Sequence, residues 1–232
     1  MILKKYETLP RDLQNKYVEE YYNIIATKKI SLLVKRLLDV MVSLIMLIIF
    51  SPIMIILAII IKLDSKGPIF YRQERITQYG KKFKILKFRT MVQNADKKGS
   101  LITKENDNRI TKIGNKIRKC RLDEFPQLIN ILKGEMSFVG TRPEVKKYVD
   151  MYTDEMKATL LMPAGVTSRA SIEFKDEDEI ISKELKKGRD IDKVYTQTVL
   201  PKKMKWNLEY MKAFNVWEDI KICIKTVIKV GK

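Results

Sequence analysis

An apolar stretch near the N-terminus limits what this chain can fold into more than any other feature. Residues 37–61 read LLDVMVSLIMLIIFSPIMIILAIII, with Lys35 and Arg36 directly before them and Lys62 directly after. A helix of about 20 apolar residues crosses the hydrocarbon core of a bilayer. The segment is therefore expected to form a helix in a membrane.

Two arrangements of this helix fit the residues. Its length favours one straight span, but Ser51 and Pro52 lie at its centre, and proline removes an amide donor and kinks a helix. A helix broken there could return to the face it entered, with the Ser51 hydroxyl helping to satisfy freed carbonyls. Basic residues flank both ends, so the positive-inside bias selects no orientation.

The charge of the chain indicates an anionic partner. Its formal net charge is +18 and its pI is near 9.7, which suits nucleic acid, an acidic lipid surface or a phosphorylated substrate. The sequence contains no histidine, so any chemistry rests on carboxylates, Lys, Arg, Tyr or Ser, and a metal would be a hard ion such as Mg²⁺. Cys120 and Cys223 are too few for a disulfide scaffold or a closed zinc site.

Residue patterns predict an α+β fold that is mostly helical. A β-hairpin is expected from two short, partly alternating segments, and a helix from near Asp123 to before Gly134. The expected elements are the hairpin over 69–76 and 82–88, helical patterns over 142–161, 175–187 and, in pieces, 194–230, and loop and strand over 164–174. The expected organisation is a polar N-terminal segment at 1–30, a membrane helix at 31–64, and a compact domain with the small hairpin at 65–232.

Asp123 and Glu124 are the carboxylates best placed for chemistry. Acidic residues at a predicted helix start commonly cap the helix and complement its dipole. These two also follow Arg118, Lys119 and Arg121, so the carboxylates stand among cations at a site that favours anions. A carboxylate can act as a nucleophile toward phosphorus, and both interpretations remain open from the residues alone.

Three further clusters offer anion contacts. Lys87 and Arg89 end the predicted hairpin, Arg109 lies in the loop-like NDNRIT, and Arg142 lies beside Pro143. Arginine binds phosphate in a bidentate manner. A solvated arginine would explain any one of them alone.

Taken together, the ordered motifs resemble the bacterial sugar transferases, the small monotopic phosphoglycosyl transferases that act on polyprenyl phosphate. The resemblance runs from Lys35 to about Lys229. Its motifs are KR..D at 35–39, SP at 51 and 52, IKLDSKGPIFYRQERI at 61–76, KFRTM at 87–91, DNRIT at 107–111, LDEFPQL at 122–128 and NILKGEMSFVGTRPE at 130–144.

The resemblance implies a re-entrant helix hinged at Ser51 and Pro52, which would keep the domain on the cytosolic face of the bacterial inner membrane. It implies that Asp123 attacks the β-phosphorus of a UDP-sugar, expels UMP and holds the phosphosugar until undecaprenyl phosphate attacks. Mg²⁺ is the implied cofactor, held by Asp123 and Glu124, and Glu124 would serve as metal or proton partner. Lys87, Arg89, Arg109, Arg118 and Arg142 would bind phosphate groups. The product would start a surface glycan and pass to downstream glycosyltransferases, with a homodimer compatible with this role.

Two departures from the family pattern stand out. The usual Gly-Pro-Arg-Pro is Gly-Thr-Arg-Pro at 140–143, so the loop loses one rigid residue. The segment at 163–172 reads PAGVTSRASI, and its Ser168 and Arg169 differ from the expected residues. Arg169 is a further candidate phosphate contact, and nucleotide or sugar preference would depend on this segment.

Two other functions are weighed against the enzyme. A membrane-tethered binder of nucleic acid or another polyanion would concentrate basic and aromatic residues on one face, whereas here Lys and Arg are spread along the chain. No nucleic-acid partner is therefore expected. An inactive scaffold of the same fold would have no chemical reason to keep Asp123, Glu124, Arg89 and Arg142.

Overall fold

The computed structural model describes residues 3–95, 107–174 and 177–230, and its fold is α+β and mostly helical, as predicted. The α-helices are α1 Lys16–Ala26, α2 Lys29–Asp64, α3 Lys112–Lys119, α4 Gln127–Lys133, α5 Lys146–Val149, α6 Arg169–Glu173, α7 Glu177–Lys186, α8 Ile191–Val194, α9 Leu200–Ala213 and α10 Val216–Val230. The strands are β1 Phe70–Ile76, β2 Lys82–Phe88, β3 Met136–Val139 and β4 Ala164–Thr167. The 3₁₀ turns are η1 Tyr6–Thr8, η2 Arg11–Leu13, η3 Gln78–Gly80, η5 Leu122–Glu124 and η6 Met156–Leu161, and η7 Tyr195–Val199 is a π-helix.

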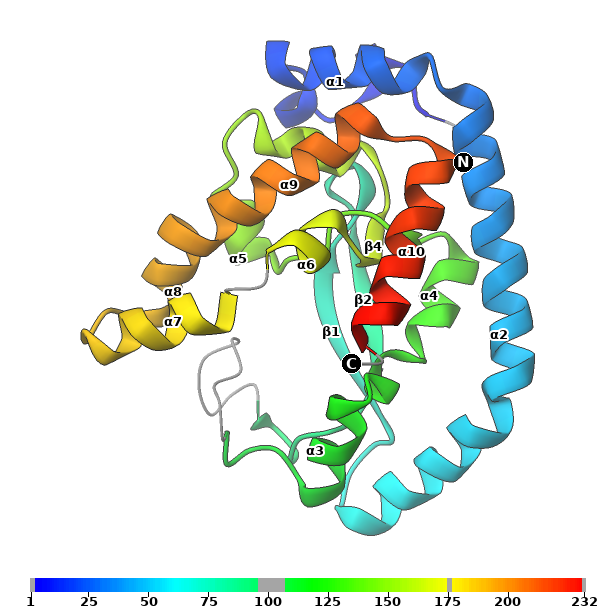
Figure 1. Ribbon diagram of the computed structural model, residues 1–232, viewed down its shortest axis with the longest axis vertical. Helices are drawn as coiled ribbons and strands as arrows, with labels where there is room; N and C mark the ends of the chain where they lie inside the picture. The colour runs from blue at the N-terminus through cyan, green and yellow to red at the C-terminus, as the bar shows by residue number, and fades with distance from the viewer. Residues whose placement is uncertain (1–2, 96–106, 175–176, 231–232) are drawn as a thin grey trace.

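The apolar stretch lies in α2, which runs down one side of the molecule and then bends beneath it (Figure 1). Within the described residues it is the one helix long and apolar enough to cross a membrane, and 11% of its most apolar window is buried. The helix is continuous through Pro52. Proline cannot donate to the carbonyl of Ile48, and the Ser51 hydroxyl does so instead at 2.8 Å. This confirms the predicted role of Ser51; re-entry into one membrane face stays a prediction.

Buried charges fix the first half of α2 to the domain. Lys35 Nζ donates to the carbonyl of Val139 at 2.8 Å and to Asp219 Oδ2 at 2.6 Å. Asp39 Oδ1 accepts from the backbone N–H of Phe138 at 3.1 Å. Buried ions are costly unless they are paired and hydrogen-bonded. The KR..D motif thus joins α2 to β3 and α10.

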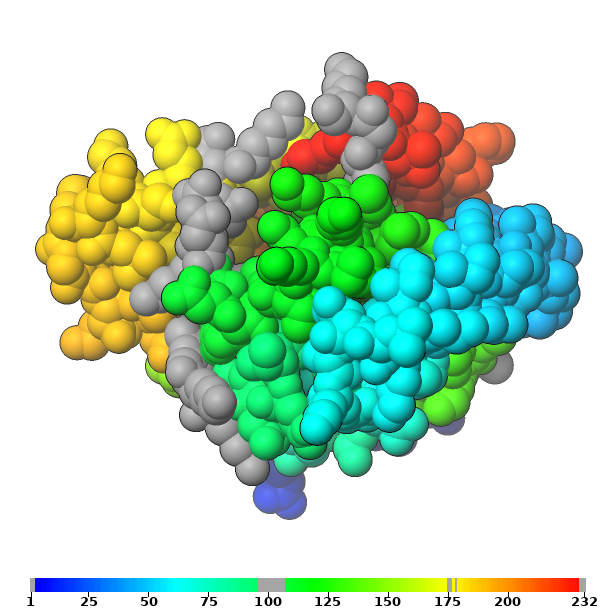
Figure 2. Space-filling model, turned by 90° about the horizontal axis from the view of Figure 1, so that it is seen from below, coloured from blue at the N-terminus to red at the C-terminus, as the bar shows by residue number. Residues whose placement is uncertain are grey.

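A second set of contacts joins α2 to α4. The Arg36 guanidinium donates to the carbonyls of Ile131 at 2.6 Å and Leu132 at 2.8 Å, at the C-terminal end of α4, where carbonyls lack helical partners. Two residues before Pro52, the ring centroid of Phe50 lies 5.0 Å from that of Phe125. Seen from below, α3 lies beside the second half of α2, with α7 on the opposite side (Figure 2).

The predicted hairpin is confirmed as the antiparallel pair β1–β2. Phe83 and Ile85 of β2 pack against Leu128 and Ile131 of α4. Asn130 of α4 also bonds the edge of β2, since its amide accepts from Leu86 N at 3.0 Å and donates to Lys84 O at 2.9 Å. Both apolar and polar contacts therefore hold α4 against the hairpin.

A second, parallel pair, β3–β4, was not predicted as a pair. Its close approach depends on glycine, because a Cβ on Gly165 would lie 2.2 Å from the backbone N of Gly140. Loop and strand were expected over 164–174: the strand is confirmed as β4, whereas most of the remaining residues form the helix α6 and not a loop. The Ser168 hydroxyl accepts from Ser171 N at 3.0 Å and thereby caps the short helix α6.

The helical pattern over 142–161 forms no continuous helix. Only α5 and η6 are regular there, and the carbonyl of Glu144 accepts from Ile76 N, at the end of β1, at 2.9 Å. The pattern over 175–187 is confirmed as α7, although residues 175 and 176 lie outside the described ranges. The pieces expected over 194–230 correspond to α9 and α10.

The N-terminal segment, expected only to be polar, contributes to the main core. Leu13, Val18, Tyr21 and Ile25 are buried in one cluster with residues of α9 and η6. The Tyr21 hydroxyl donates to Glu155 at 2.8 Å. The buried residues of α1 lie on one face of this helix, and they pack against the rest of the main core.

Candidate active site

Most of the residues singled out from the sequence line one pocket of about 970 Å³. It lies among the hairpin, η5, α3 and the loop after β3, and it reaches η7 and α9. The predicted site residues in its wall are Asp123, Lys87, Arg89, Arg109, Arg118 and Arg142. The fold thus brings together side chains from distant parts of the sequence.

Glu124 forms ion pairs with two of the cations of this site. Its Oε1 accepts from Lys87 Nζ at 2.9 Å and from Arg142 Nη2 at 2.6 Å. Arg142 also donates to the carbonyl of Val166 at 3.3 Å. Lys87 comes from β2, Arg142 from the loop after β3, and Glu124 from η5. One carboxylate oxygen therefore joins three segments of the chain.

These contacts fix the charge of Glu124. Burial alone would raise its pKa, but Arg142 and Lys87 together hold the pKa of Glu124 well below its usual range. Burial lowers the pKa of Lys87, with Glu124 opposing that change. Glu124 is thus ionised at neutral pH, and its Oε2 accepts no hydrogen bond from the described residues.

Asp123 is the opposite case, although it is the next residue. Its side chain is buried, with 8% exposed, and lines the pocket. Burial raises the pKa of Asp123, with Lys87 opposing the rise and Glu124 adding to it. Among the described residues, no other residue donates a hydrogen bond to this carboxylate.

The alternative that Asp123 caps a helix finds no contact to support it. The helix α4 begins at Gln127, its cap residue is Pro126, and no side chain caps it. Asp123 lies instead in the 3₁₀ turn η5, directly after Arg121, whose φ of 56° is unusual for a residue with a side chain. Such conformations cluster at functional sites.

Arg89 lies in the wall of the pocket but points toward α2. Its Nη2 donates to the carbonyl of Ser65 at 2.6 Å and to that of Ile61 at 3.2 Å, at the end of α2. Its Nε and Nη1 are buried and have no hydrogen-bond partner within the described residues. A Cβ on Gly67 would lie 2.2 Å from Nη1. Arg89 therefore ties the hairpin to the end of α2.

The structure separates the other two candidate arginines. Arg109 lines the pocket and forms an ion pair with Asp107 at 2.6 Å. Arg169 does not line the pocket; it pairs with Glu209 at 3.5 Å and lies over the Trp206 ring, 5.6 Å from its centroid. Of the two, only Arg109 faces the same space as Asp123.

Gln127 is a pocket residue that was not singled out from the sequence. It is 1% exposed, and its Nε2 has no hydrogen-bond partner within the described residues. A buried amide without a partner is uncommon and needs an explanation. Its place beside Asp123 had a signal in the sequence, because a helix predicted from near Asp123 puts the residue four positions later on the same face. Its burial had none.

The acidic residues of this site fit Mg²⁺ better than a metal that needs a closed set of protein ligands. Among the described residues no cluster of three or more His, Cys, Asp or Glu could form a closed metal site. Mg²⁺ needs no such cluster, because it is commonly held by one or two carboxylates together with substrate phosphates and water. Among the described residues, the Asp123 carboxylate and Glu124 Oε2 accept no hydrogen bond from another residue, so both are available to such an ion; Asp123 lines the pocket, and Glu124 is not among its lining residues.

Comparison with known proteins gives the family. The profile described as "Bacterial sugar transferase" matches residues 30–232. The chain belongs to the bacterial sugar transferase family. The bacterial sugar transferase match begins after α1, so α1, which packs against α9, lies outside it.

Three relatives illustrate the sugars named within the bacterial sugar transferases. The chain is 33% identical over 84% of its length to the UDP-N-acetylgalactosamine-undecaprenyl-phosphate N-acetylgalactosaminephosphotransferase of Aeromonas hydrophila. It is 35% identical over 85% to the UDP-glucose:undecaprenyl-phosphate glucose-1-phosphate transferase of Escherichia coli (strain K12), and 34% identical over 86% to the undecaprenyl-phosphate galactose phosphotransferase of Salmonella typhimurium. The matches cover 43%, 40% and 40% of those proteins, so the chain spans less than half of each relative's length.

Proposed function

We propose that the protein transfers a sugar 1-phosphate from a UDP-sugar to undecaprenyl phosphate and releases UMP. The observation that carries this proposal is Asp123, a buried carboxylate facing a pocket rich in cations, with no hydrogen bond from another described residue. The neighbouring Glu124 is already paired with Lys87 and Arg142. The names of the three relatives support this donor class and this acceptor.

The transfer takes two displacements at one phosphorus atom. A carboxylate oxygen of Asp123 forms a bond to the β-phosphorus, and the bond from that phosphorus to the bridging oxygen breaks, so UMP leaves with the bridging oxygen. A phosphate oxygen of the carrier lipid then attacks the same phosphorus. The bond to Asp123 breaks, the carboxylate is restored, and the lipid carries a diphosphate-linked sugar.

The other side chains stabilise charge and position. Lys87, Arg118 and Arg142 face the pocket and favour a diphosphate. Gln127 Nε2 would donate to a phosphoryl oxygen, which accounts for a buried donor that has no partner among the described residues. Glu124, held ionised, would not donate a proton and instead keeps Lys87 and Arg142 in place.

Mg²⁺ is the proposed cofactor. Asp123 and Glu124 would hold it, and the ion would supply charge compensation for phosphate groups. A carboxylate with a raised pKa beside an ionised one gains most from such a cation.

The proposed location is the cytosolic face of the bacterial inner membrane, with α2 entering and leaving on that side. The Ser51 hydrogen bond to Ile48 supports a bend within lipid, because it satisfies a carbonyl that Pro52 frees. The net charge of +18 suits an anionic cytoplasmic leaflet. The product would be the substrate for glycosyltransferases that build a surface glycan.

The test is nucleotide release by the purified, detergent-solubilised protein with Mg²⁺, undecaprenyl phosphate and a panel of UDP-sugars. UMP and UDP are measured separately, and UMP that depends on lipid is expected from at least one donor. A second measurement uses donor labelled at the β-phosphorus without lipid, where label should remain on the denatured protein. UDP as the nucleotide product would contradict the proposal.

A further inference from the structure

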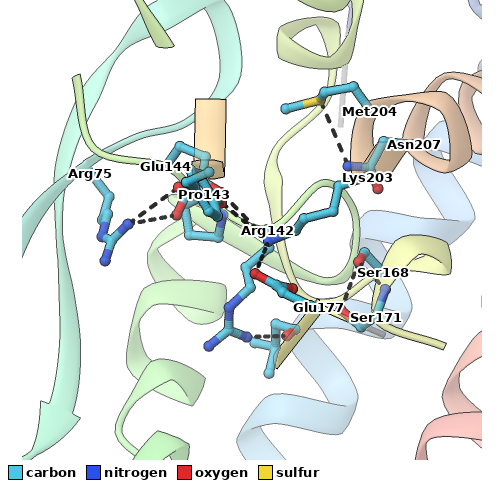
Figure 3. Close-up of polar contacts among 12 residues, drawn as sticks. Arg75, Arg142, Pro143, Glu144, Ser168, Ser171, Glu177, Lys203, Met204 and Asn207 are labelled. Carbon is cyan, nitrogen blue, oxygen red and sulfur yellow. Dashed lines mark hydrogen bonds and ion pairs between the residues drawn. The ribbon is translucent and has the colours of Figure 1, made fainter. Parts of the chain in front are cut away.

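The pocket that holds Asp123 has a second polar region, which the mechanism above does not use. It is formed by Glu144, Glu177, Tyr195 and Lys203, which come from the loop after β3, from α7, from η7 and from α9. Figure 3 shows Lys203 on one side of Glu144 and Arg75 on the other.

Lys203 is the centre of this region. Its Nζ lies 3.2 Å from Glu177 Oε1, 3.2 Å from the Tyr195 hydroxyl and 3.9 Å from Glu144 Oε1, and 13% of its side chain is exposed. The Tyr195 hydroxyl in turn donates to Glu144. Burial and Glu144 raise the pKa of Tyr195, so this hydroxyl keeps its proton. The lysine is thus held in one position by three neighbours.

The carboxylates of Glu144 and Glu177 differ in how many further hydrogen bonds they can accept. Glu144 is paired on both oxygens, with Tyr195 and Lys203 at Oε1 and with Arg75 at 3.7 Å from Oε2. Glu177 is 32% exposed, and among the described residues Lys203 is its partner. A carboxylate has about four acceptor positions. Glu177 can therefore accept further hydrogen bonds from a molecule in the pocket.

The two regions of the pocket differ in their balance of charge, and they therefore favour different ligands. Around Asp123 the cations outnumber the acids, which suits phosphate. In the second region Arg75 and Lys203 are balanced by Glu144 and Glu177, and this balance gives no preference for an anion. A fixed carboxylate beside an ammonium group offers an acceptor and a donor side by side, which suits neighbouring hydroxyl groups.

A short stretch of backbone joins the second region to the residues around Asp123. Arg142, which bonds Glu124, and Glu144, which bonds Tyr195, are separated by Pro143 alone. Two residues of extended backbone span roughly 7 Å. In a UDP-sugar the sugar is attached directly to the β-phosphorus, whereas the ribose lies beyond the α-phosphate. The hydroxyl groups nearest the reacting atom are those of the sugar.

We propose that Glu177 and Lys203 form the subsite that binds the hydroxyl groups of the donor's sugar and thereby selects among UDP-sugars. This proposal rests on the proposed function for its donor class. A site that hydrogen-bonds a substrate hydroxyl discriminates against an analogue that lacks this hydroxyl, because the polar groups of the site are then left unpaired. The pair therefore selects by hydroxyl configuration.

The test compares Glu177→Ala and Glu177→Gln with Glu179→Gln, a control at an exposed position of the same helix. Affinity for each UDP-sugar and for UMP is measured by displacement of a labelled UDP-sugar, and kcat/KM where turnover occurs. We expect Glu177→Ala to weaken the preferred donor by about 10- to 100-fold, Glu177→Gln by less, and UMP by less than about twofold. The ratio between the preferred donor and its epimers should fall.

Each other outcome is informative. An equal loss for UMP and UDP-sugars would mean that Glu177 binds ribose, and an unchanged ratio among donors would mean that it selects nothing; either result overturns the subsite. Wild-type protein that binds no UDP-sugar more tightly than UMP also overturns it. Sugar-dependent binding without lipid-dependent UMP release would instead reject the proposed function and retain the subsite.

Discussion

Asp123 and Glu124 are adjacent in sequence, yet the fold gives them opposite electrostatic surroundings. The sequence predicted that acids and bases would meet here, because basic residues precede the pair. The sequence could not predict which of the two acids would form ion pairs. Lys87 and Arg142 come from separate segments of the chain, and both bond Glu124. Gln127 was missed because its burial depends on packing that no local pattern encodes.

Replacing Asp123 by Asn should separate activity from stability. Loss of the proposed nucleophile should lower lipid-dependent UMP release by roughly 10³-fold or more. Burial raises the pKa of Asp123, so the ionised group destabilises the fold above that pKa, and the effect is absent below the ordinary carboxyl pKa. Thermal unfolding at several pH values should show Asp123→Asn more stable than wild type near neutral pH and equal to it in acid.

The matched control is Asp154→Asn, an exposed acid whose one ion pair within the described part of the chain is with Lys157. It should leave UMP release and its pH dependence unchanged. Asp123→Asn that keeps wild-type turnover would place the nucleophile elsewhere.

Gln127→Leu should also lower activity without lowering stability, in this case at an uncharged side chain. It removes a buried amide donor that has no partner among the described residues, so thermal stability should be unchanged or higher. Loss of one donor to a phosphoryl oxygen should lower kcat by about 10²- to 10³-fold. A variant that is both unstable and fully active would assign Gln127 a structural role instead.

At the scale of elements, the sequence predicted those whose pattern is local. The hairpin followed from alternation in two segments and the turn between them, and α4 from helical spacing that ends at Gly134, whose φ is 78°. The strands β3 and β4 have four residues each, and they pair in parallel across a long separation. Their contact depends on glycines 140 and 165, a tertiary constraint that short strands do not reveal.

Gly165→Ala should disturb the site through the backbone. The new Cβ would lie 2.2 Å from Gly140 N and 2.5 Å from Gly140 O, so β3 and β4 must separate and carry Arg142 with them. A displacement near 1 Å lowers rates by about 10²-fold, and steady-state kcat should fall by that factor. Gly80→Ala is the control: its φ of 72° brings strain of about 1–2 kcal/mol, but open space surrounds it, so kcat should not change.

Lys35→Met should test the attachment of α2. The substitution leaves Asp219 buried without its cation, which is expected to cost roughly 3–5 kcal/mol in unfolding free energy. Lys62→Met, at the exposed end of the same helix, removes one exposed hydrogen bond and should change stability little. Unfolding of both variants in detergent gives the comparison, and equal stabilities would mean that the buried pair does not anchor the helix.

For the whole molecule, charge and hydropathy predicted the class of partner but not its position. The net charge of +18 is spread along the chain, and only the fold gathers the cations around one pocket. The N-terminal segment was assigned no role because its composition is polar. Its few apolar residues nevertheless share a core with α9, since helical spacing puts them on one face.

Cysteine labelling should decide the topology of α2. In a background with Cys120→Ser and Cys223→Ala, single cysteines replace Ile30 and Lys66, which lie at or just beyond the two ends of the helix and are exposed. A re-entrant helix makes both reactive from the cytosolic side. Labelling from opposite faces would establish a single span.

Helix α2 is held at its first half by Lys35, Arg36 and Asp39 and at its end by Arg89. A helix fixed at two places cannot tilt without turning the domain with it. With α2 in the membrane as proposed, the depth of this helix in the lipid would also set the height of Asp123 above the headgroups. Bilayer thickness and lateral pressure would then change the distance between Asp123 and the phosphate of the carrier lipid, and with it the rate of transfer.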